Sequence, residues 1–457
     1  MEPPTYRANI LEHCRIAPPP NSATEMSLPL TFFDMLCLVL PPIQSLYFYE
    51  LPQFADSLLP NIKHSLSLTL KHFLPFAGNL TWPKDSEVPL IRYVEKDSVS
   101  LTVAESDGDF YHLSGTHCRD ITEILPLIPD LPISDKQAPV LALQVTVFPN
   151  RGICVATTIH HAVADGRTIS LFMKTWASIC RLGGDSSLLP ESLPFYDRNV
   201  IKDPSGLQKV FLTELSNLTS ECEVESENWS FKLWDNVAPP NSVKAIFELR
   251  RDDIERLRKW VVKRLAKDKQ SAQDSVPHLS AFVLACAFLC HCLVTAGEDE
   301  SREKTYCMFP VDCRARLEPP VPATYFGNCV RGGIVSLETN RVLGEDGMVV
   351  AVEAIRGAIN ELENGVLRGL EEFVSAMSSI DVLEIIWIAW SPRFRVYDTN
   401  FGWERPKKME ILMTAGCRVI SLVESRDGDG GIEVGLELDR KQMQVFSSLF
   451  VDGIKAL

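Results

Sequence analysis

Residues Ile153 to Gly166, ICVATTIHHAVADG, decide the fold class. Their first part, up to His160, is a β-branched run typical of a buried strand, and the turn sequence PNRG separates it from a similar run at 141–148. A helix is predicted directly afterwards, at Thr168 to Cys180, because its apolar residues recur on one face. Two strands, a turn and a helix in this order indicate a chain that mixes α and β structure.

The whole chain is long enough for two domains. It has 457 residues, about three times the ~150 typical of one domain. Hydrophobic periodicity is lost between Leu182 and about Asn241, where Gly, Pro and Ser gather. We therefore expect an N-terminal domain at 1–185, a crossover linker at 186–240 and a C-terminal domain at 241–457. Further helices are predicted at 58–73, 252–267, 281–296 and 348–363, and further strands at 304–310 and 332–337.

Composition excludes several classes of function. The chain has 45 Lys and Arg against 60 Asp and Glu, a net charge of −15, so its surface would repel nucleic acid. No signal peptide or lipidation signal is visible, and the most apolar run, 281–296, is shorter than the ~20 residues that cross a bilayer. The 13 Cys form no CxxC pair, which favours reduced thiols. We expect a cytoplasmic protein with no nucleic-acid or membrane partner.

The two histidines at the end of the predicted strand are the residues most informative about chemistry. A His in this place projects from a rigid element and can take up a proton near neutral pH. Asp165 lies four residues after His161, and Gly166 would relieve the backbone at a tight turn. The alternative is structural: Asp165 only caps the next helix and both histidines bind nearby backbone. No second His or Cys cluster adds metal ligands, so we predict no metal site, and no GxSxG motif offers a serine nucleophile.

The sequence resembles the BAHD family of plant acyl-CoA-dependent acyltransferases. The HxxxD motif of that family matches His161 to Asp165, and its DFGWG motif matches Asn400 to Glu404 with both end positions changed. The resemblance covers the whole chain, and YFGNC (325–329) and SPRF (391–394) are similar to the branch that acylates flavonoid and other phenolic glycosides. It implies two α/β domains of the chloramphenicol-acetyltransferase-like type with a solvent channel between them. It leaves open that a segment near 385–412 packs on the N-terminal domain.

The resemblance also implies roles for the HxxxD residues. His161 would be the general base, removing the proton of an acceptor hydroxyl that attacks the thioester directly, without an acyl-enzyme. Asp165 would point away from the substrate and pair with an arginine, which fixes the turn that aims His161. Arg314 and Arg316, both in the DCRAR segment, are the candidate partners.

The DFGWG-like segment would be a structural loop away from the base, formed by Asn400, Gly402 and Trp403. Its two departures from the family pattern bear on that loop. Asn400 lacks the usual carboxylate charge, and Glu404 replaces a Gly whose backbone angle can be unusual. We expect a shifted loop and retained activity.

Binding of the two substrates needs further groups. Coenzyme A carries phosphates at two places, so an acidic protein must gather cations or a helix N-terminus to hold it. A malonyl carboxylate needs a cation, a coumaroyl group needs an apolar slot, and the transient oxyanion needs a hydrogen-bond donor. The candidates for coenzyme A are Ser280, Arg405, Lys407 and Lys408; those for the acyl group and the oxyanion are Arg167, Ser391 and Arg393; those for the acceptor, which remain unordered, are Thr31, Phe32, Phe33, Asp34 and Tyr325.

The sequence therefore predicts an acyl-CoA-dependent O-acyltransferase that acylates a sugar hydroxyl of a flavonoid, anthocyanin or other phenolic glycoside. Malonyl-CoA is the favoured donor and acyl-CoA is a co-substrate, with no tightly bound cofactor and with a monomeric chain. The alternatives are a hydroxycinnamoyl-CoA-dependent enzyme on the same acceptors, an N-acyltransferase, and a catalytically silent relative that binds phenolics or partners.

Overall fold

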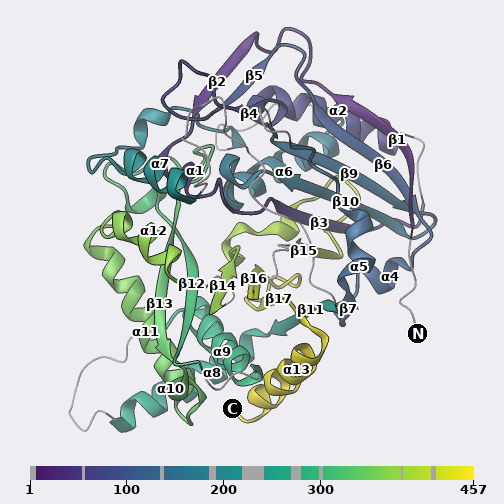
Figure 1. Cartoon of the computed structure of the whole chain (residues 1–457). Coiled ribbons are helices and arrows are strands. Elements are labelled where there is room, and N and C mark those ends of the chain that lie inside the picture. Colours follow the sequence, from purple (N-terminus) through teal and green to yellow (C-terminus); the bar gives the residue numbers. More distant parts are fainter. Residues whose placement is uncertain are drawn as a thin grey trace.

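Two β-sheets, each built mainly from one half of the chain, organise the protein (Figure 1). The computed structural model describes residues 7–53, 57–133, 138–184, 192–218, 241–268, 279–297, 302–381, 384–412 and 418–457. The N-terminal sheet has the order β1 (Ala8–Ile16), β6 (Val99–Ser106), β9 (Leu141–Phe148), β10 (Gly152–Ile159), β3 (Ile43–Glu50) and β15 (Lys408–Leu412). The C-terminal sheet has the order β13 (Val330–Glu338), β12 (Lys304–Asp312), β14 (Ile385–Ala389), β16 (Arg418–Glu424), β17 (Ile432–Asp439), β11 (Ser242–Leu249) and β7 (Arg119–Asp120). A smaller sheet has the order β2 (Glu25–Pro29), β5 (Leu90–Val94), β4 (Asn79–Thr81) and β8 (Ala138–Pro139).

Helices bury the apolar faces of these sheets. In the N-terminal half, α2 and α6 pack on each other, and in the C-terminal half α9 packs against α8, α11 and α13. The longer helices are α2 (Leu58–His72), α6 (Gly166–Arg181), α7 (Leu207–Leu218), α8 (Arg251–Asp268), α9 (Ala281–Ala296), α11 (Gly347–Glu361), α12 (Leu370–Ser378) and α13 (Arg440–Lys455). The short ones are α1 (Phe32–Met35), α3 (Leu74–Ala77), α4 (Phe110–Leu113), α5 (Ile121–Ile124) and α10 (Thr339–Leu343).

The predicted elements around the histidine pair are present, with small shifts at their ends. β10 is buried along its whole length and pairs antiparallel with both β9 and β3, so it is an interior strand of its sheet. Its last residue is Ile159, one residue before the predicted end. α6 begins at Gly166, two residues earlier than predicted, because the Asp165 carboxylate accepts the N–H of Thr168 at 3.0 Å and starts the helix there.

The predicted crossover linker at 186–240 contains a helix that was not predicted from the sequence, α7. α7 packs against α1 and α12, and its buried side chains Leu207, Phe211 and Leu215 recur every four residues. This spacing places them on one helical face, a signal that the many Gly and Pro of the surrounding sequence masked. Parts of the linker, at 186–191 and 219–240, lie outside the described residues.

The two halves exchange strands, so the domain boundary in sequence is not the boundary in space. β15, from the C-terminal half, pairs antiparallel with β3 and forms one edge of the N-terminal sheet. β7, from the N-terminal half, pairs with β11 at one edge of the C-terminal sheet. The segment at 385–412 is therefore divided, since β14 lies in the C-terminal sheet and β15 in the N-terminal one.

A buried group of charges lies where these exchanged strands meet. Arg119 of β7 donates to the carboxylate of Glu410 in β15, and the ammonium of Lys408 lies 2.8 Å from the same carboxylate. Burial alone would raise the pKa of Glu410, but the positive charges of Arg119 and Lys408 lower it to about 2. Each exchanged strand thus carries a charge that is satisfied by the other strand.

The described residues contain neither a membrane-spanning helix nor a metal-binding cluster. None of the helices in the described ranges is long and apolar enough to cross a membrane. The described part of the chain also holds no group of three His, Cys, Asp or Glu side chains placed to bind a metal.

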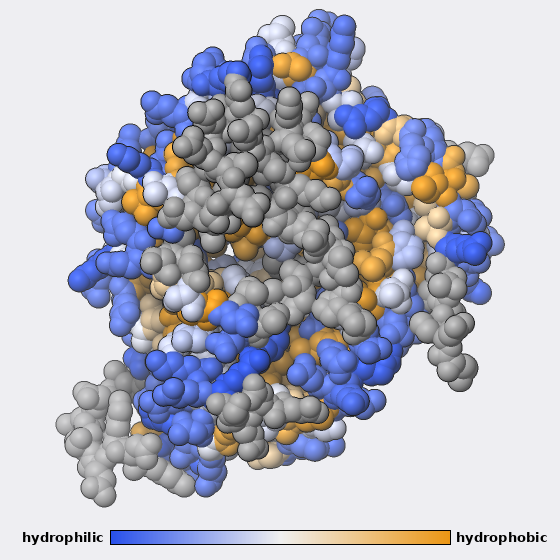
Figure 2. Space-filling model, in the orientation of Figure 1, coloured by the Kyte–Doolittle hydropathy of each residue, from blue (hydrophilic) through white to orange (hydrophobic). Residues whose placement is uncertain are grey.

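Figure 2 shows that hydrophilic residues cover most of the visible described surface, while many of the hydrophobic ones lie at mid-height, between the N-terminal and C-terminal parts.

Candidate active site

The HHAVADG segment forms the turn between β10 and α6. His160 follows the last residue of β10 and is fully buried, and its Nδ1 accepts the N–H of Ala162 at 3.2 Å. His161 begins a short 3₁₀ turn, His161–Val163, and is half-buried. The two neighbouring histidines therefore differ: His160 belongs to the interior, and His161 faces accessible space at the end of an interior strand.

The surroundings of His161 keep its imidazole neutral. Burial lowers the pKa of His161 below its usual value, and this is only partly offset by the ring's own backbone carbonyl and by the charge of Asp165. Burial also lowers the pKa of His160, to about 3. Nδ1 of His161 is shielded from solvent and has no hydrogen-bond partner among the described residues. Of the two ring nitrogens, Nε2 is therefore the one that is not shielded in this way.

Asp165 is both a helix cap and one half of a buried ion pair, so the two interpretations of this residue hold together. Its Oδ1 accepts the N–H of Thr168, while Oδ2 lies 2.8 Å from NH1 of Arg314 and accepts the N–H of Cys329 at 3.2 Å. Burial alone would raise the pKa of Asp165, but the Arg314 charge and these hydrogen bonds lower it. Arg316 instead donates to the Asp312 carbonyl and is exposed, so Arg314 is the arginine that pairs with Asp165.

The loop Tyr325 to Cys329, of sequence YFGNC, encloses this turn from the C-terminal half. Arg314 donates through NH2 to the carbonyls of Tyr325 (3.2 Å) and Gly327 (3.1 Å), and the Thr168 hydroxyl lies 3.1 Å from the same Gly327 carbonyl. Arg314 thus binds the loop and the HxxxD turn at once.

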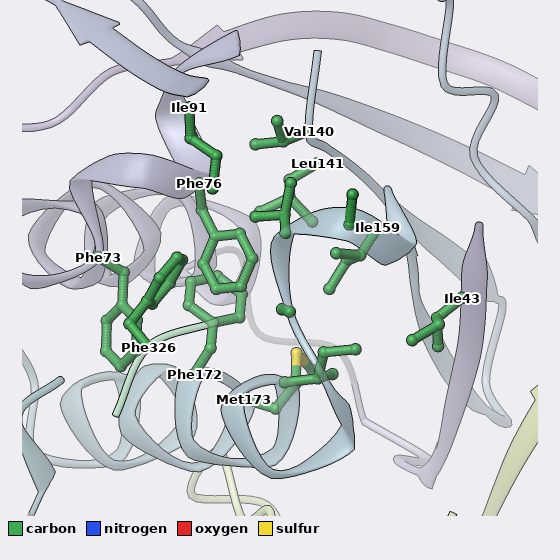
Figure 3. Close-up of a cluster of buried hydrophobic side chains, with 14 of the residues drawn as sticks. Ile43, Phe73, Phe76, Ile91, Val140, Leu141, Ile159, Phe172, Met173 and Phe326 are labelled. Atoms are coloured by element: carbon green, nitrogen blue, oxygen red, sulfur yellow. The ribbon is translucent and has the colours of Figure 1, made fainter. Parts of the chain in front are cut away.

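Phe326 anchors the loop in the N-terminal core. Figure 3 shows its ring beside Phe73, Phe76 and Phe172, and its centroid is 5.1 Å from that of Phe76. A residue of the C-terminal half is therefore a core residue of the N-terminal half. This contact holds the loop in the place where Arg314 and Cys329 reach Asp165.

Gly166 is required for space rather than for its backbone angle, which corrects the expectation from the sequence. It is the first residue of α6 and is absent from the glycines with positive φ. A Cβ at this position would lie 2.6 Å from the ring of Phe394 and 3.1 Å from that of Trp390. The turn carrying SPRF thus packs directly against the start of α6.

Trp390 is a residue of this site that the sequence did not single out. It is buried, its φ is 67°, and its indole N–H is buried with no hydrogen-bond partner among the described residues. A buried unpaired donor is costly, so such a group next to a candidate active site suggests a role with a ligand. Its position directly before SPRF was the available signal.

The candidates for the acyl group lie near this turn, but they differ in whether their polar groups already have partners. Ser391 accepts the N–H of Arg393 at 3.3 Å as a cap, and Arg393 itself is exposed. Arg167 is partly exposed, and its Nε is 2.9 Å from the Asp312 carboxylate, so its charge already has a partner.

The DFGWG-like loop is held by one side-chain hydrogen bond and by aromatic packing. Oδ1 of Asn400 accepts the N–H of Gly402 at 2.8 Å, an acceptor role that needs no carboxylate charge. Trp403 stacks on Phe401 at 5.2 Å and packs edge-on against Tyr49 at 5.4 Å. Glu404 has a φ of 144°, a value that residues with a side chain rarely adopt. The aromatic packing therefore holds the loop, and the strain is concentrated at Glu404.

The candidates for coenzyme A are not gathered at one place. Arg405 and Lys407 line a surface hollow of about 320 Å³ together with Arg426. Lys408 is buried and donates to the Gly115 carbonyl, so it faces away from this hollow and cannot meet a phosphate there. Ser280 caps α9 in the C-terminal half, where it accepts the N–H of Val283 at 3.2 Å.

The candidates for the acceptor are all buried in the structure. Asp34 is the clearest case, because it has no exposed surface and its carboxylate accepts four hydrogen bonds. The five residues are Thr31, Phe32, Phe33, Asp34 and Tyr325.

The ion pair gives a first prediction. Replacing Arg314 by Gln leaves the buried Asp165 carboxylate without its partner, so the free energy of unfolding should fall by about 3–5 kcal/mol. The matched variant Arg316→Gln removes an exposed guanidinium and should change it by less than about 0.5 kcal/mol. Urea denaturation of both variants checks this, and equal effects would contradict it.

The backbone of Glu404 gives a second prediction. Glu404→Gly should stabilise the fold by about 1 kcal/mol, because relief of about 1–3 kcal/mol of strain exceeds the entropic cost of glycine. Glu404→Ala keeps a Cβ in the same conformation and should give no such gain. Thermal unfolding of the two variants side by side separates strain from the loss of the carboxylate; stabilisation by both would show that the charge is responsible.

Comparison with known proteins places this site in a family. Residues 9–452 match the Transferase family. The chain is 36% identical to phenolic glucoside malonyltransferase 1 of Arabidopsis thaliana, over 98% of this chain and 97% of that protein. It is 37% identical to a malonyl-coenzyme:anthocyanin 5-O-glucoside-6'''-O-malonyltransferase of Salvia splendens, over 99% and 96% of the two chains. It is also 37% identical to a coumaroyl-CoA:anthocyanidin 3-O-glucoside-6''-O-coumaroyltransferase of Arabidopsis thaliana, over 98% and 97%.

Solved structures share the fold at much lower identity. Vinorine synthase superposes with a TM-score of 0.70 at 18% identity, covering 97% of this chain and 98% of its own. The TRI101 protein of F. graminearum, in complex with ethyl coenzyme A, superposes with a TM-score of 0.66 at 13% identity, covering 93% and 97%. These likenesses confirm the predicted two-domain α/β fold of the chloramphenicol-acetyltransferase-like type. Because the family match and the relatives both span nearly the whole chain, the protein belongs to the Transferase family, that of the BAHD acyltransferases.

Proposed function

We propose that this acyltransferase moves a malonyl group from coenzyme A to a sugar hydroxyl of a phenolic glycoside. The observation that carries the proposal is the neutral, half-buried His161, held at the end of an interior strand by the Asp165–Arg314 pair. The malonyltransferases among its relatives, named for phenolic and anthocyanin glucosides, support the choice of donor and acceptor.

The residues of the site supply the steps of this reaction. Nε2 of His161 takes the proton of the sugar hydroxyl as its oxygen forms a bond to the thioester carbonyl carbon. The tetrahedral intermediate then collapses, the carbon–sulfur bond breaks, and the imidazolium returns the proton to the leaving thiolate. Positioned proton transfer of this kind contributes on the order of 10²–10⁴ to the rate. No protein nucleophile takes part.

The oxyanion and the coenzyme need separate partners. Two groups are candidate donors to the oxyanion: the indole N–H of Trp390, which has no partner among the described residues, and the O–H of Ser391, which is not used when its oxygen accepts the N–H of Arg393. Arg405 and Lys407 are the candidates for a phosphate of coenzyme A, because they share one surface hollow, which Glu50 and Glu404 also line. A phosphate bound there displaces the Asp398 carboxylate, 3.4 Å from Arg405, and the Glu50 carboxylate, 3.5 Å from Lys407. Arg393 is the candidate cation for the malonyl carboxylate, because it is exposed and Arg167 is already paired.

A second candidate donor is a hydroxycinnamoyl-CoA. It is favoured by one observation, the coumaroyltransferase that matches this chain at the same level of identity as the malonyltransferases. Malonyl and coumaroyl donors demand opposite pockets, one cationic and one apolar, so a direct competition between the two thioesters decides between them.

The base gives a third prediction. His161→Ala should lower kcat by about 10²–10⁴ with malonyl-CoA and a panel of phenolic glucosides, because it removes the proton acceptor. His117→Ala, which removes an exposed histidine, is the matched control and should keep full turnover. Thiol release is measured for both. Glucoside binding without turnover in the unmodified protein would instead support a silent binding relative.

The lowered pKa of His161 gives a fourth prediction. Only the neutral imidazole accepts a proton, so kcat/KM falls as the pH falls through the pKa of His161 in the free enzyme. Because burial lowers this pKa below the usual 6.5, the acid limb should have its midpoint below pH 6.5. The pH profile of kcat/KM checks this; a midpoint above pH 6.5 would show that the group is not enclosed as described.

A further inference from the structure

A network of hydrogen bonds connects His161 with Asp34 in the N-terminal segment. It begins at Asp34 in α1, which has no exposed surface. Oδ2 of Asp34 accepts the N–H and the hydroxyl of Thr31, both at 2.9 Å. Oδ1 accepts the backbone N–H of Asn328 at 2.8 Å and its side-chain Nδ2 at 3.1 Å. The buried carboxylate is thus fully used, and half of its hydrogen bonds come from one residue of the YFGNC loop.

Asn328 connects this carboxylate with the candidate base. Its Nδ2, besides binding Asp34, donates to the backbone carbonyl of His161 at 3.0 Å. An amide nitrogen has two hydrogens, so these two bonds use its whole donor capacity. The amide oxygen of Asn328 is buried and has no partner among the described residues. The side chain therefore gives up an acceptor bond in order to place both of its N–H groups.

The charge of Asp34 determines this orientation. If the amide were flipped, its oxygen would face two acceptors, the Asp34 carboxylate and the His161 carbonyl, and two buried hydrogen bonds would be lost. The guanidinium of Arg198 lies close to the same carboxylate, with NH1 3.5 Å from Oδ2 of Asp34. Asp34 thus selects the Asn328 orientation in which an N–H points at His161.

The carbonyl of His161 is the group through which this hydrogen-bond network can act on the imidazole ring. The carbonyl and Cα of His161 belong to one planar peptide unit, so holding the carbonyl restrains the side chain and leaves rotation about the Cα–C bond to set its direction. Asp165 holds the far end of the same turn from four residues away. With Asn328 at His161 itself, the turn is held at both ends by the C-terminal half.

We propose that Asn328, oriented by Asp34, is a positioning residue that aims the His161 ring at the acceptor hydroxyl. The inference rests on the proposed role of His161 as the base and extends it, since neither Asp34 nor Asn328 touches a substrate. A displacement of about 1 Å at the reacting atoms can cost about 100-fold in rate, so loss of this bond should appear in kcat and leave KM for the donor unchanged.

The first test removes the bond without adding charge. In Asn328→Ser the side chain ends one bond short of the His161 carbonyl, and we expect kcat to fall by about 10- to 100-fold with an unchanged KM. Thr305→Val is the matched control, because it removes another buried hydrogen bond, the 3.1 Å contact between the hydroxyls of Thr305 and Thr339 in the C-terminal half. It should lower the thermal midpoint by a similar amount and leave kcat unchanged.

The second test separates positioning from stability. The double variant Asp34→Asn with Asn328→Asp exchanges the two side chains, keeps the negative charge near Arg198 and restores an N–H···O bond between them. It has no donor for the His161 carbonyl, because a carboxylate only accepts. We expect its thermal midpoint to recover relative to Asn328→Asp alone, while its kcat remains about 10- to 100-fold low.

The outcomes distinguish failure of the positioning role from failure of the proposed function. If kcat of the exchange variant recovers together with its thermal midpoint, or if Asn328→Ser loses stability and keeps kcat within twofold, Asn328 serves the fold alone and the inference is wrong. The proposed function then still stands if His161→Ala is inactive. If His161→Ala keeps full turnover, the proposed base is wrong, and the positioning role falls with it.

Discussion

The buried ion pair between Asp165 and Arg314 is the constraint on which the rest of the site depends. Both side chains are nearly inaccessible, so each charge has lost its hydration and is stabilised mainly by the other. Such a pair contributes little net stability compared with apolar packing, but it tolerates only one arrangement of its members. Here that arrangement joins the turn after β10 to a segment almost 150 residues later in the chain. The position of His161 follows from this arrangement, because His161 lies in the same turn as Asp165.

The YFGNC loop shows how the second half of the chain builds the site of the first. Its five residues provide a ring for the N-terminal core, two carbonyls for Arg314, an N–H for Asp165 and an amide for His161. None of these contacts is visible from the spacing of the residues. They require that the loop follow one path, which Phe326 secures by packing among the phenylalanines of the other half (Figure 3).

The sequence was sufficient for the local structure and for the family, and insufficient for contacts between distant segments. β9 and α9 have the predicted bounds because strong periodicity determines them. Asp165 and His161 were identified from one motif, yet only the structure distinguishes Arg314 from Arg316, since two residues of separation decide which guanidinium points inward. Lys408 was grouped with Arg405 and Lys407 by proximity in sequence, but it is the first residue of β15, a strand that is buried along its whole length. Trp390 and Asn328 lie beside or within recognisable motifs, but the motifs do not show their roles, which depend on unpaired or shared hydrogen bonds.

The position of β15 in the N-terminal sheet has a consequence for synthesis on the ribosome. This strand comes from residues 408–412 of a chain of 457, so nearly nine-tenths of the protein must be translated before the sheet that carries His161 is complete. Until then the hydrogen-bonding edge of β3 is open, and an open edge of a nascent sheet is a template for pairing with other chains. Expression of the first half alone should therefore give an aggregation-prone fragment, and chaperone assistance should be needed late in translation, when the missing strand has not yet emerged.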